Sequence, residues 1–348
     1  MSTTPPAAAV TLGTRGSNLA RAQTDSVVEL LVTAWPGSSY DVRPIVTQGD
    51  RTQVSGEPLP EIGGKGLFTL ELERALRDGE IDLAVHSLKD LPTEATPGVV
   101  IGAVCSREDA RDCLVARDGL TLAELPRGSV VGTSSLRREA QLRALRPDLE
   151  IRSIRGNVDT RVDKVRRGEY GAAVLAAAGI RRLGLEGVVT EWLAPETMLP
   201  APGQGAVAVQ CRADDERVLE LVAAIDDRAS RVTTTAERTF LRELGGGCAA
   251  PVAAHAEVVA RRADDASNSL LQGVLGVRMN GLVASIDGSE VIRVRGEGEP
   301  EELGERLARE ALAAGADVIL EAIRFDVSGV RPAGSDSIAT GPGSDPRV

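Results

Sequence analysis

Aromatic residues and histidine are scarce in this chain of 348 residues. Aromatic side chains make up 2% of the sequence, and 2 residues are histidine. So few rings exclude the base-stacking platforms of proteins that bind single-stranded nucleic acids. The 4 cysteines show no CxxC spacing, and with so few histidines a zinc site is not expected. We therefore predict neither a metal nor a nucleic-acid partner, and cores built from Ala, Val, Leu and Ile.

Long hydrophobic runs are also missing. No apolar stretch approaches the ~20 residues that a membrane helix needs. The first residues, MSTTPPAAAV, lack the basic start and apolar run of a secretory signal. We therefore expect a cytoplasmic protein with no membrane partner and with free thiols at Cys105, Cys113, Cys211 and Cys248. A net charge of −11 argues against a basic nucleic-acid-binding face, although arginines gather locally.

The first quarter of the chain alternates short apolar runs with helical patterns. We expect strands near residues 10–14, 41–47 and 81–85, and helices over 19–32 and 67–77. Ser17 or Asn18 is a suitable N-cap for the first helix. This alternation predicts an α/β domain with a mainly parallel sheet. The polar, glycine-rich stretch 48–66 is long for a plain connection, so we interpret it as a mobile functional loop.

The second quarter repeats this pattern. Residues 132–136, like 13–17, follow a strand and open a helix, and residues 166–174, like 77–85, pass from a helix through a Gly-Glu turn into a buried strand. Strand–turn–helix units look alike in many α/β proteins, which is the simpler explanation. We favour two similar α/β domains that face each other across a cleft, because such clefts commonly bind ligands.

The rest of the chain predicts a small α+β domain. Residues 199–205 form a rigid turn, and the strand 206–210 that follows could return to the first domain. The capping box Thr234–Glu237 predicts a helix that begins there and runs to Leu244, before three strands, with a tight hairpin at Asp287-Gly288, and a helix over 301–314. We interpret 261–269 as a polar hairpin extension. The expected limits are 8–105 with 203–226, then 106–202, then 227–327, and a disordered tail over 328–348.

Arg137 and Arg138 are the first candidate for binding chemistry. They fall in the first turn of a helix that opens with Thr133, Ser134 and Ser135. Cations there oppose the positive end of the helix dipole, so the pattern is explained if an anion binds alongside them. The alternative is that both guanidinium groups simply point into solvent.

Further arginines stand at similar junctions between strands and helices: Arg15, Arg155, Arg161 and Arg182. Such junctions line one edge of a parallel sheet, where ligands of open α/β folds bind. Because charged hydrogen bonds are strong, several arginines can hold a small polyanion firmly. We therefore expect a ligand with several carboxylates or phosphates.

Lys89, Asp90 and Cys248 could carry chemistry in addition to binding. Asp90 follows the first domain's central strand, and an ionised carboxylate among arginines could stabilise a cation or exchange protons. A structural salt bridge between Lys89 and Asp90 is equally compatible with the sequence. Cys248 follows three glycines and could form a covalent bond, or could simply follow a helix C-cap.

Several stretches together resemble the hydroxymethylbilane synthase family, also called porphobilinogen deaminase. The similarity extends from about Val10 to Glu321, in matching order and spacing. The stretches that carry it are Gly13–Ser17, Gly63–Phe68, Ala84–Pro92, Gly132–Arg138, Ile151–Arg161, Leu199–Val207 and Gly245–Ala249. The resemblance implies an α/β fold with two domains like periplasmic binding proteins and a small C-terminal α+β domain. It also implies a transferase that joins porphobilinogen molecules head to tail, releases ammonia and hydrolyses the linear tetrapyrrole product to hydroxymethylbilane.

The resemblance also implies roles for particular residues. Cys248 would carry a dipyrromethane cofactor through a thioether, and Asp90 would stabilise the azafulvene cation formed as ammonia leaves. Substrate and cofactor carboxylates would be bound by Arg15, Arg137, Arg138, Arg155, Arg161 and Arg182. Accessory contacts would come from Ser17, Lys65, Lys89, Thr133, Ser134, Ser135, Gln204 and Gly205. Asn18 and Arg21 depart from the family pattern without touching this chemistry.

A non-catalytic binding protein for a small organic polyanion is the alternative to an enzyme. It would explain the cleft and the arginines equally well. It gives no role to Asp90 or Cys248, and ammonia release from porphobilinogen would distinguish the two. For the enzyme we expect a monomer.

Overall fold

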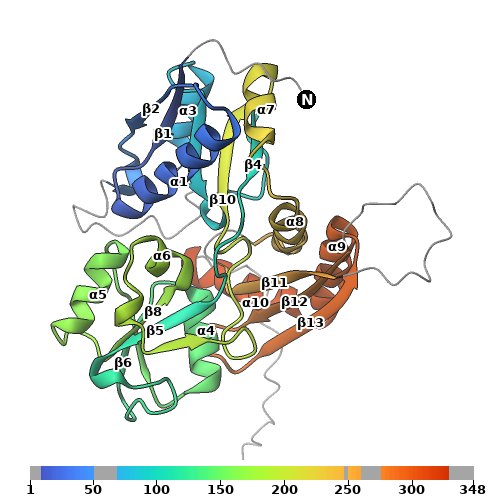
Figure 1. Ribbon diagram of the computed structural model, residues 1–348. Coiled ribbons are helices and arrows are strands. Elements are labelled where there is room, and N and C mark those ends of the chain that lie inside the picture. The colour runs from blue at the N-terminus through green and yellow to red at the C-terminus, as the bar shows by residue number, and fades with distance from the viewer. Residues whose placement is uncertain (1–8, 51–68, 247–249, 260–275, 329–348) are drawn as a thin grey trace, which may run out of the picture.

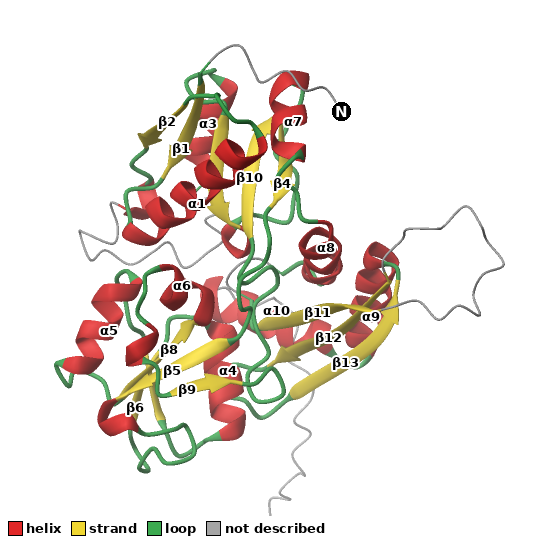
Figure 2. Ribbon diagram, in the orientation of Figure 1, coloured by secondary structure: helices red, strands yellow, loops and turns green. Residues whose placement is uncertain are grey.

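The computed structural model describes residues 9–50, 69–246, 250–259 and 276–328, and this part of the chain forms three sheets (Figures 1 and 2). The first sheet has the strand order β2-β1-β3-β10-β4. Its strands are β1 (Val10–Thr14), β2 (Tyr40–Pro44), β3 (Leu83–Ser87), β4 (Val99–Val104) and β10 (Val207–Arg212). The accompanying helices are α1 (Asn18–Ala34), α3 (Leu70–Arg77), α7 (Glu216–Ala223) and the short η1 (Leu88–Asp90). We call these elements the first unit.

The second sheet has the same topology as the first. Its order is β7-β6-β8-β5-β9, and in each sheet the fourth strand of the order is antiparallel to both neighbours while the other four strands run in one direction. The strands are β5 (Asp112–Ala116), β6 (Val130–Gly132), β7 (Glu150–Arg152), β8 (Ala172–Ala176) and β9 (Glu191–Leu193). The helices are α4 (Leu136–Leu145), α5 (Val158–Arg166), α6 (Ala177–Arg182), η2 (Arg117–Gly119) and η3 (Glu186–Val188). These elements are the second unit, and the predicted repetition of one α/β architecture is confirmed.

The chain crosses twice between these two units. It passes from β4 into β5, and it returns from β9 to β10, which inserts between β3 and β4. Figure 1 shows the two crossing segments side by side, with α1 and α6 facing each other where the units meet. The predicted return of the strand near 206–210 to the first sheet is confirmed.

The third unit packs beside these crossings and is built on an antiparallel sheet of order β11-β12-β13 (Figure 1). Its elements are α8 (Arg228–Glu243), β11 (Val252–Val259), β12 (Gly276–Ala284), β13 (Val291–Gly298), α9 (Pro300–Ala313) and α10 (Ala316–Ser328). Phe240 is buried at its centre, and Gly281 makes room for the ring, because an added Cβ would lie 2.7 Å from the Phe240 Cζ. The predicted mixed fold with a small α+β part is confirmed, whereas α10 was not expected.

The predicted start of α8 is wrong. The helix begins at Arg228, where the Asp227 side chain accepts a hydrogen bond from the Ser230 amide at 2.7 Å. Thr234 therefore lies inside the helix, and its hydroxyl donates to the Ser230 carbonyl instead of capping an end. A Thr-x-x-Glu pattern fits any place in a helix where its two residues share a face, so it does not by itself mark a beginning.

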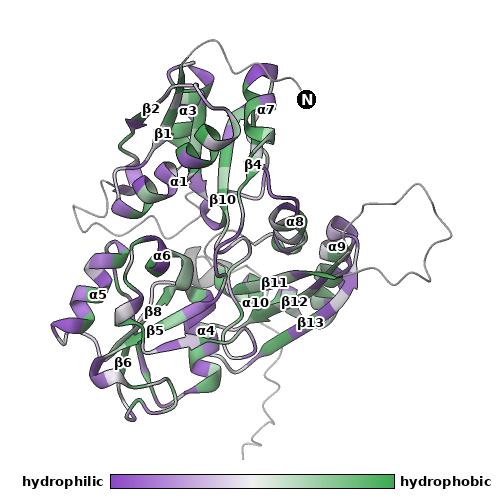
Figure 3. Ribbon diagram, viewed as in Figure 1, coloured by the Kyte–Doolittle hydropathy of each residue, from purple (hydrophilic) through white to green (hydrophobic). Residues whose placement is uncertain are grey.

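Apolar strands account for the cores of the first two units. Figure 3 shows β10 as largely hydrophobic and α5 as largely hydrophilic. The aliphatic residues of β1, β3 and β10 pack with α1 and α7, and those of β5 and β8 pack on both faces of the second sheet. Within the described residues, no helix has the length and apolar character needed to span a membrane. The hairpin expected at 261–269, most of the loop 48–66 and nearly all of the tail lie outside these residues.

Candidate active site

Polar side chains of the first two units meet around a cavity of about 320 Å³. Ser17 and Asn157, which precede α1 and α5, line it from opposite units. The Ser17 hydroxyl accepts from the Ala20 amide at 3.2 Å, which confirms the predicted N-cap. Across the same gap, Asn18 Nδ2 donates to Asp159 Oδ2 at 3.0 Å. Helix N-termini present unpaired N–H groups, so two of them beside one cavity favour an anionic ligand.

Arg15 follows β1 and approaches the same cavity. Its Nη2 lies 2.5 Å from Asp50 Oδ1, and Asp50 lines the cavity wall. Burial would raise the pKa of Asp50, but hydrogen bonds from Arg15 and Thr47 lower it below its ordinary value. Arg15 is thus held in place by a carboxylate that stays ionised.

Lys89 and Asp90 lie on η1, directly after the central strand β3. Asp90 is exposed, whereas Lys89 is partly buried and its Nζ donates to Gln204 Oε1 at 3.2 Å. Burial lowers the pKa of Lys89 to about 8, although the negative charge of Asp90 opposes this. Lys89 therefore loses its proton at a much lower pH than an ordinary lysine, and it is adjacent in sequence to Asp90, the carboxylate expected to be catalytic.

Arg238 of α8 holds the turn that carries these two residues. Its Nη1 donates to the carbonyls of Leu88 and Leu91, at 3.3 and 3.0 Å, and its Nη2 donates to the Pro92 carbonyl at 2.6 Å. The third unit thereby fixes the backbone on both sides of Asp90. Arg238 was not among the predicted residues, since nothing in an amphipathic helix shows which arginine turns inward.

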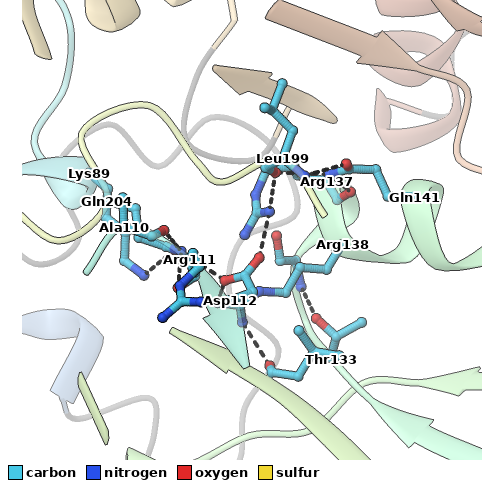
Figure 4. A network of polar contacts seen from close by, with 12 residues as sticks. Lys89, Ala110, Arg111, Asp112, Thr133, Arg137, Arg138, Gln141, Leu199 and Gln204 are labelled. Carbon is cyan, nitrogen blue, oxygen red and sulfur yellow. Dashed lines mark hydrogen bonds and ion pairs between the residues drawn. The ribbon is translucent and has the colours of Figure 1, made fainter. Parts of the chain in front are cut away.

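Arg137 and Arg138 are buried, with exposed fractions of 3% and 6%, so the alternative that they point into solvent is wrong. Both bind Asp112 at the start of β5 (Figure 4): Arg137 Nη1 lies 2.7 Å from Oδ2, and Arg138 Nη2 lies 2.8 Å from Oδ1. Arg137 also donates to the Leu199 carbonyl, and Arg138 to that of Val174. Some of the N–H donors of each guanidinium group thus hold it in place.

Asp112 is a site residue that was not predicted from the sequence. Burial would raise its pKa, but Arg137 and Arg138 hold that pKa well below the usual range. A signal did exist, because Asp112 is an acidic residue that opens a strand of otherwise apolar residues. A fully buried carboxylate requires a cationic partner, and the nearby arginine pair was the obvious candidate.

The hydroxyl residues before α4 shape the preceding turn instead of capping the helix. Ser135 occupies the N-cap position, but no hydrogen bond from its side chain to the helix is seen in the described structure. Instead Thr133 Oγ1 accepts from the Ser135 amide at 3.2 Å, and Ser134 donates to the Ile154 carbonyl at 2.7 Å. These bonds shape the turn that delivers the two arginines to Asp112.

The remaining arginines lie around the same region with different exposure. Arg161 Nε donates to the Gly156 carbonyl at 2.8 Å, and Arg155 beside that turn is exposed. Burial lowers the pKa of Arg161 to about 10, with the charge of Arg138 adding to the effect and that of Asp90 opposing it. Arg161 therefore lies within electrostatic reach of both Arg138 and Asp90.

Gln204 and Gly205 connect the two units at the returning crossing. Gln204 Nε2 donates to Asp112 Oδ1 and to the Ala110 carbonyl, both at 2.8 Å. Arg182 Nη2 donates to the Gly205 carbonyl at 2.7 Å. Gly205 has φ +92°, and an added Cβ would lie 2.3 Å from the Glu108 carbonyl oxygen, so only glycine fits. Two predicted residues, Lys65 and Cys248, lie outside the described part of the chain.

The arginine pair is suited to a ligand with several carboxylates. Nε of Arg137 and Nε of Arg138 are buried and have no hydrogen-bond partner among the described residues. A buried donor left without an acceptor is costly, and carboxylate oxygens would satisfy both atoms. The residues present therefore fit a dipyrromethane with acetate and propionate groups.

Two family models match the chain. "Porphobilinogen deaminase, dipyromethane cofactor binding domain" matches residues 10–220, and "Porphobilinogen deaminase, C-terminal domain" matches 232–313. A porphobilinogen deaminase of Roseiflexus sp. strain RS-1 is 48% identical over 309 residues, which is 89% of this chain and 97% of that protein. One of Mycolicibacterium gilvum is 48% identical over 315 residues, covering 90% and 98%.

Solved structures that resemble this chain are more distant. The periplasmic VFT2 domain of BvgS from Bordetella pertussis has a TM-score of 0.38 and 14% identity, over 62% of this chain and 86% of that one. A substrate-binding protein of an amino acid ABC transporter has a TM-score of 0.33 and 12% identity, over 63% and 92%. Likeness at this level carries no functional weight, and the fold assignment stands on the two sheets described above.

Proposed function

The chain belongs to the porphobilinogen deaminase family, and from this we propose how its own residues carry out that family's reaction. The reaction is the stepwise, head-to-tail condensation of four porphobilinogen molecules with loss of ammonia, followed by hydrolysis to hydroxymethylbilane. One observation carries the residue assignment: two buried arginines, whose Nε atoms have no partner among the described residues, lie within electrostatic reach of Lys89 on the turn that bears Asp90.

The binding residues in this proposal surround the interface between the first two units. Arg137 and Arg138 hold carboxylates of the bound dipyrromethane, because their Nε atoms lack acceptors among the described residues. The other carboxylate-binding and accessory residues are those predicted from the sequence: Arg15, Ser17, Lys65, Lys89, Thr133, Ser134, Ser135, Arg155, Arg161, Arg182, Gln204 and Gly205. When bound, the dipyrromethane supplies the pyrrole carbon to which the first substrate is joined.

Cys248 is our proposed attachment point for the dipyrromethane. The chain's other cysteines are buried, and burial raises their pKa to about 11 for Cys105, 12 for Cys113 and 11 for Cys211. A thiol that stays protonated is a poor nucleophile. These cysteines are therefore unsuited to forming a thioether, which supports the assignment to Cys248.

Asp90 is our proposed catalytic residue. When ammonia leaves porphobilinogen, the C–N bond breaks, the nitrogen keeps the bonding electrons and the methylene carbon becomes cationic. An ionised carboxylate at Asp90 stabilises that cation through its negative charge. After the new C–C bond forms, the attacked ring carbon loses a proton, and in this proposal Asp90 accepts it. Arg238 keeps the Asp90 backbone in position through its bonds to Leu88, Leu91 and Pro92.

The domain limits and the setting of the protein belong to the same proposal. We assign residues 8–105 with 203–226, 106–202 and 227–327 to three domains, supported by the partition of strands among the three sheets. The protein would act as a cytoplasmic monomer with porphobilinogen and the linear tetrapyrrole as its small-molecule partners, and without nucleic acid or membrane.

The test combines ammonia release with intact mass. Purified wild-type protein incubated with porphobilinogen should release ammonia and carry an added mass of two linked pyrroles, which Cys248→Ser should lack. Asp90→Asn should bind substrate but turn over about 10²–10⁴-fold more slowly, whereas Asp118→Asn, at a turn of the second unit, should match wild type. Wild-type protein that binds porphobilinogen without releasing ammonia would support the binding-protein alternative, and normal turnover by Asp90→Asn would remove Asp90 from the mechanism.

A further inference from the structure

Asp112 is the single carboxylate bound by both Arg137 and Arg138 in the described structure, and it has no exposed surface. Its two oxygens are divided between the guanidinium groups, with Oδ2 facing Arg137 and Oδ1 facing Arg138. Two guanidinium groups that share a small buried space repel each other unless an anion lies between them. Asp112 therefore makes it possible for the pair to lie side by side.

Asp112 is also connected to the opposite unit. Gln204 Nε2 donates to Asp112 Oδ1 at 2.8 Å, and Gln204 Oε1 accepts from Lys89 Nζ at 3.2 Å. One amide thus joins the arginine pair of the second unit to a lysine of the first (Figure 4). Because an amide both donates and accepts, it can hold a carboxylate on one side and an ammonium on the other.

The group as a whole has positive charge left over for a ligand. Arg137 and Arg138 are both cationic, and Asp112 neutralises one charge of this pair. Asp112 occupies Nη1 of Arg137 and Nη2 of Arg138, while both Nε atoms stay without a partner among described residues. The carboxylate thus fixes the orientation of both guanidinium groups without using all of their donors.

We propose that Asp112 is a positioning residue, which aligns Arg137 and Arg138 for ligand carboxylates and, through Gln204, ties their position to Lys89 across the two units. This inference rests on the proposed function of the arginine pair and extends it to a residue that does not itself touch the ligand. It predicts that loss of the Asp112 charge impairs dipyrromethane assembly and changes the titration of Lys89.

A purely structural role for Asp112 predicts something different. In that case Asp112→Asn would lower stability, but folded protein would load and titrate as wild type does. Lys89 provides the readout that distinguishes the two. Among the described residues, the charged groups that act on its pKa are Asp90 on its own turn, Asp112 on β5, and Arg137 and Arg138 on α4.

The direction of the change in titration follows from these charges. Burial lowers the pKa of Lys89 to about 8, and Asp112 partly offsets this by favouring the ammonium form. Removing the Asp112 charge lowers the pKa of Lys89 further. The alkaline decline of kcat/KM should therefore move to lower pH, by about one unit for the loss of a nearby opposite charge.

The experiment compares Asp112→Asn with Asp109→Asn. Asp109 is a matched control, because it also forms a bidentate ion pair, with Arg111 Nε and Nη2 at 3.0 and 2.7 Å. The difference is that the Arg111 side chain is 37% exposed. Each variant and wild type are incubated with porphobilinogen and weighed intact for the added mass of two linked pyrroles. They are also assayed from about pH 6 to about pH 10, a range that spans the lowered pKa of Lys89. For Asp112→Asn we expect at least a tenfold slower gain of mass and the alkaline shift, and for Asp109→Asn neither.

Every outcome bears on the proposal. Folded Asp112→Asn that gains mass at the wild-type rate with an unchanged alkaline limb would overturn it, as would equal effects in both variants. If Asp112→Asn does not fold, Gln204→Met takes its place, since it breaks the connection between Asp112 and Lys89 without stranding a charge. An unchanged alkaline limb in Gln204→Met would then refute the coupling, and a shift to lower pH would support it. Failure of wild-type protein to release ammonia would instead count against the proposed function.

Discussion

Glu237 offers the sharpest test of how the third unit is attached to the other two. Its side chain is fully buried and receives four hydrogen bonds. Oε1 accepts from Arg107 Nη1 and the Ala256 amide, both at 2.7 Å, and Oε2 accepts from Arg107 Nη2 at 2.9 Å and the Gly203 amide at 2.7 Å. Arg107 and Gly203 lie on the two crossings between the first and second units, so one carboxylate joins both crossings to α8.

Replacing Glu237 by Gln keeps the shape but removes the charge. Each carboxylate oxygen faces two donors, so the new NH2 group must face two donors whichever way the amide is turned. Arg107, 11% exposed, would also lose its counterion. Breaking a buried ion pair from one side costs about 3–5 kcal/mol, and we expect Glu237→Gln to lower the free energy of unfolding by that amount.

Urea unfolding followed by circular dichroism measures this loss against a surface control. Glu310→Gln removes a pair with Arg306 on α9 whose side chains are 47% and 43% exposed, and it should cost about 0.5 kcal/mol or less. Adding Arg107→Met to Glu237→Gln removes the stranded cation, so the double variant should be more stable than Glu237→Gln alone. Equal losses for Glu237→Gln and Glu310→Gln would refute this reasoning.

Three further predictions concern the site. Burial lowers the pKa of Lys89 from 10.5 to about 8, so between these pH values the unfolded chain binds more protons than the folded one. The free energy of unfolding should therefore rise with pH over this range. Chemical unfolding at about pH 7.5 and about pH 10 should show this rise in wild type and not in Lys89→Met. Arg238→Gln should lower kcat about tenfold with little change in KM, because the Asp90 turn loses its bonds while the arginine pair stays in place; a change confined to KM would contradict this. Gly205→Ala should lower the melting temperature by several degrees, because its Cβ would strike the Glu108 carbonyl oxygen, and an unchanged melting temperature would contradict the tight packing of this turn.

Local patterns are enough to predict much of the fold. The strand at Val10–Thr14, the cap at Ser17 and the helix after it follow from hydrophobic periodicity and capping chemistry, which act within a few residues. The repetition of this pattern predicts the shared topology of the two larger sheets. The predicted start of α8 is wrong because Glu237 looks like a capping residue with local partners. Its partners Arg107 and Gly203 are in fact distant in the sequence.

For the candidate site too, residues set by local patterns could be predicted and residues set by distant contacts could not. The predicted arginines follow strand ends, where a sequence shows what the sheet edge will carry, and the structure places Arg137 and Arg138 together as expected. Arg107 and Arg238 were missed because each acts through a contact between units, and Asp112 was missed because its partners Arg137 and Arg138 lie 25 and 26 residues away in the sequence. Such contacts depend on which buried charges pair with each other in the folded chain, and local sequence patterns do not specify that pairing.

The insertion of β10 between β3 and β4 has a consequence for synthesis on the ribosome. The second sheet is built from a continuous stretch, from β5 at Asp112 to β9 at Leu193, and can close as soon as that stretch has emerged. The first sheet cannot, because the strand that joins β3 to β4 begins at Val207, after the whole second sheet has been made. The nascent chain can therefore complete its second sheet before its first, and until then β3 and β4 have unpaired edges, which are prone to pair with other chains.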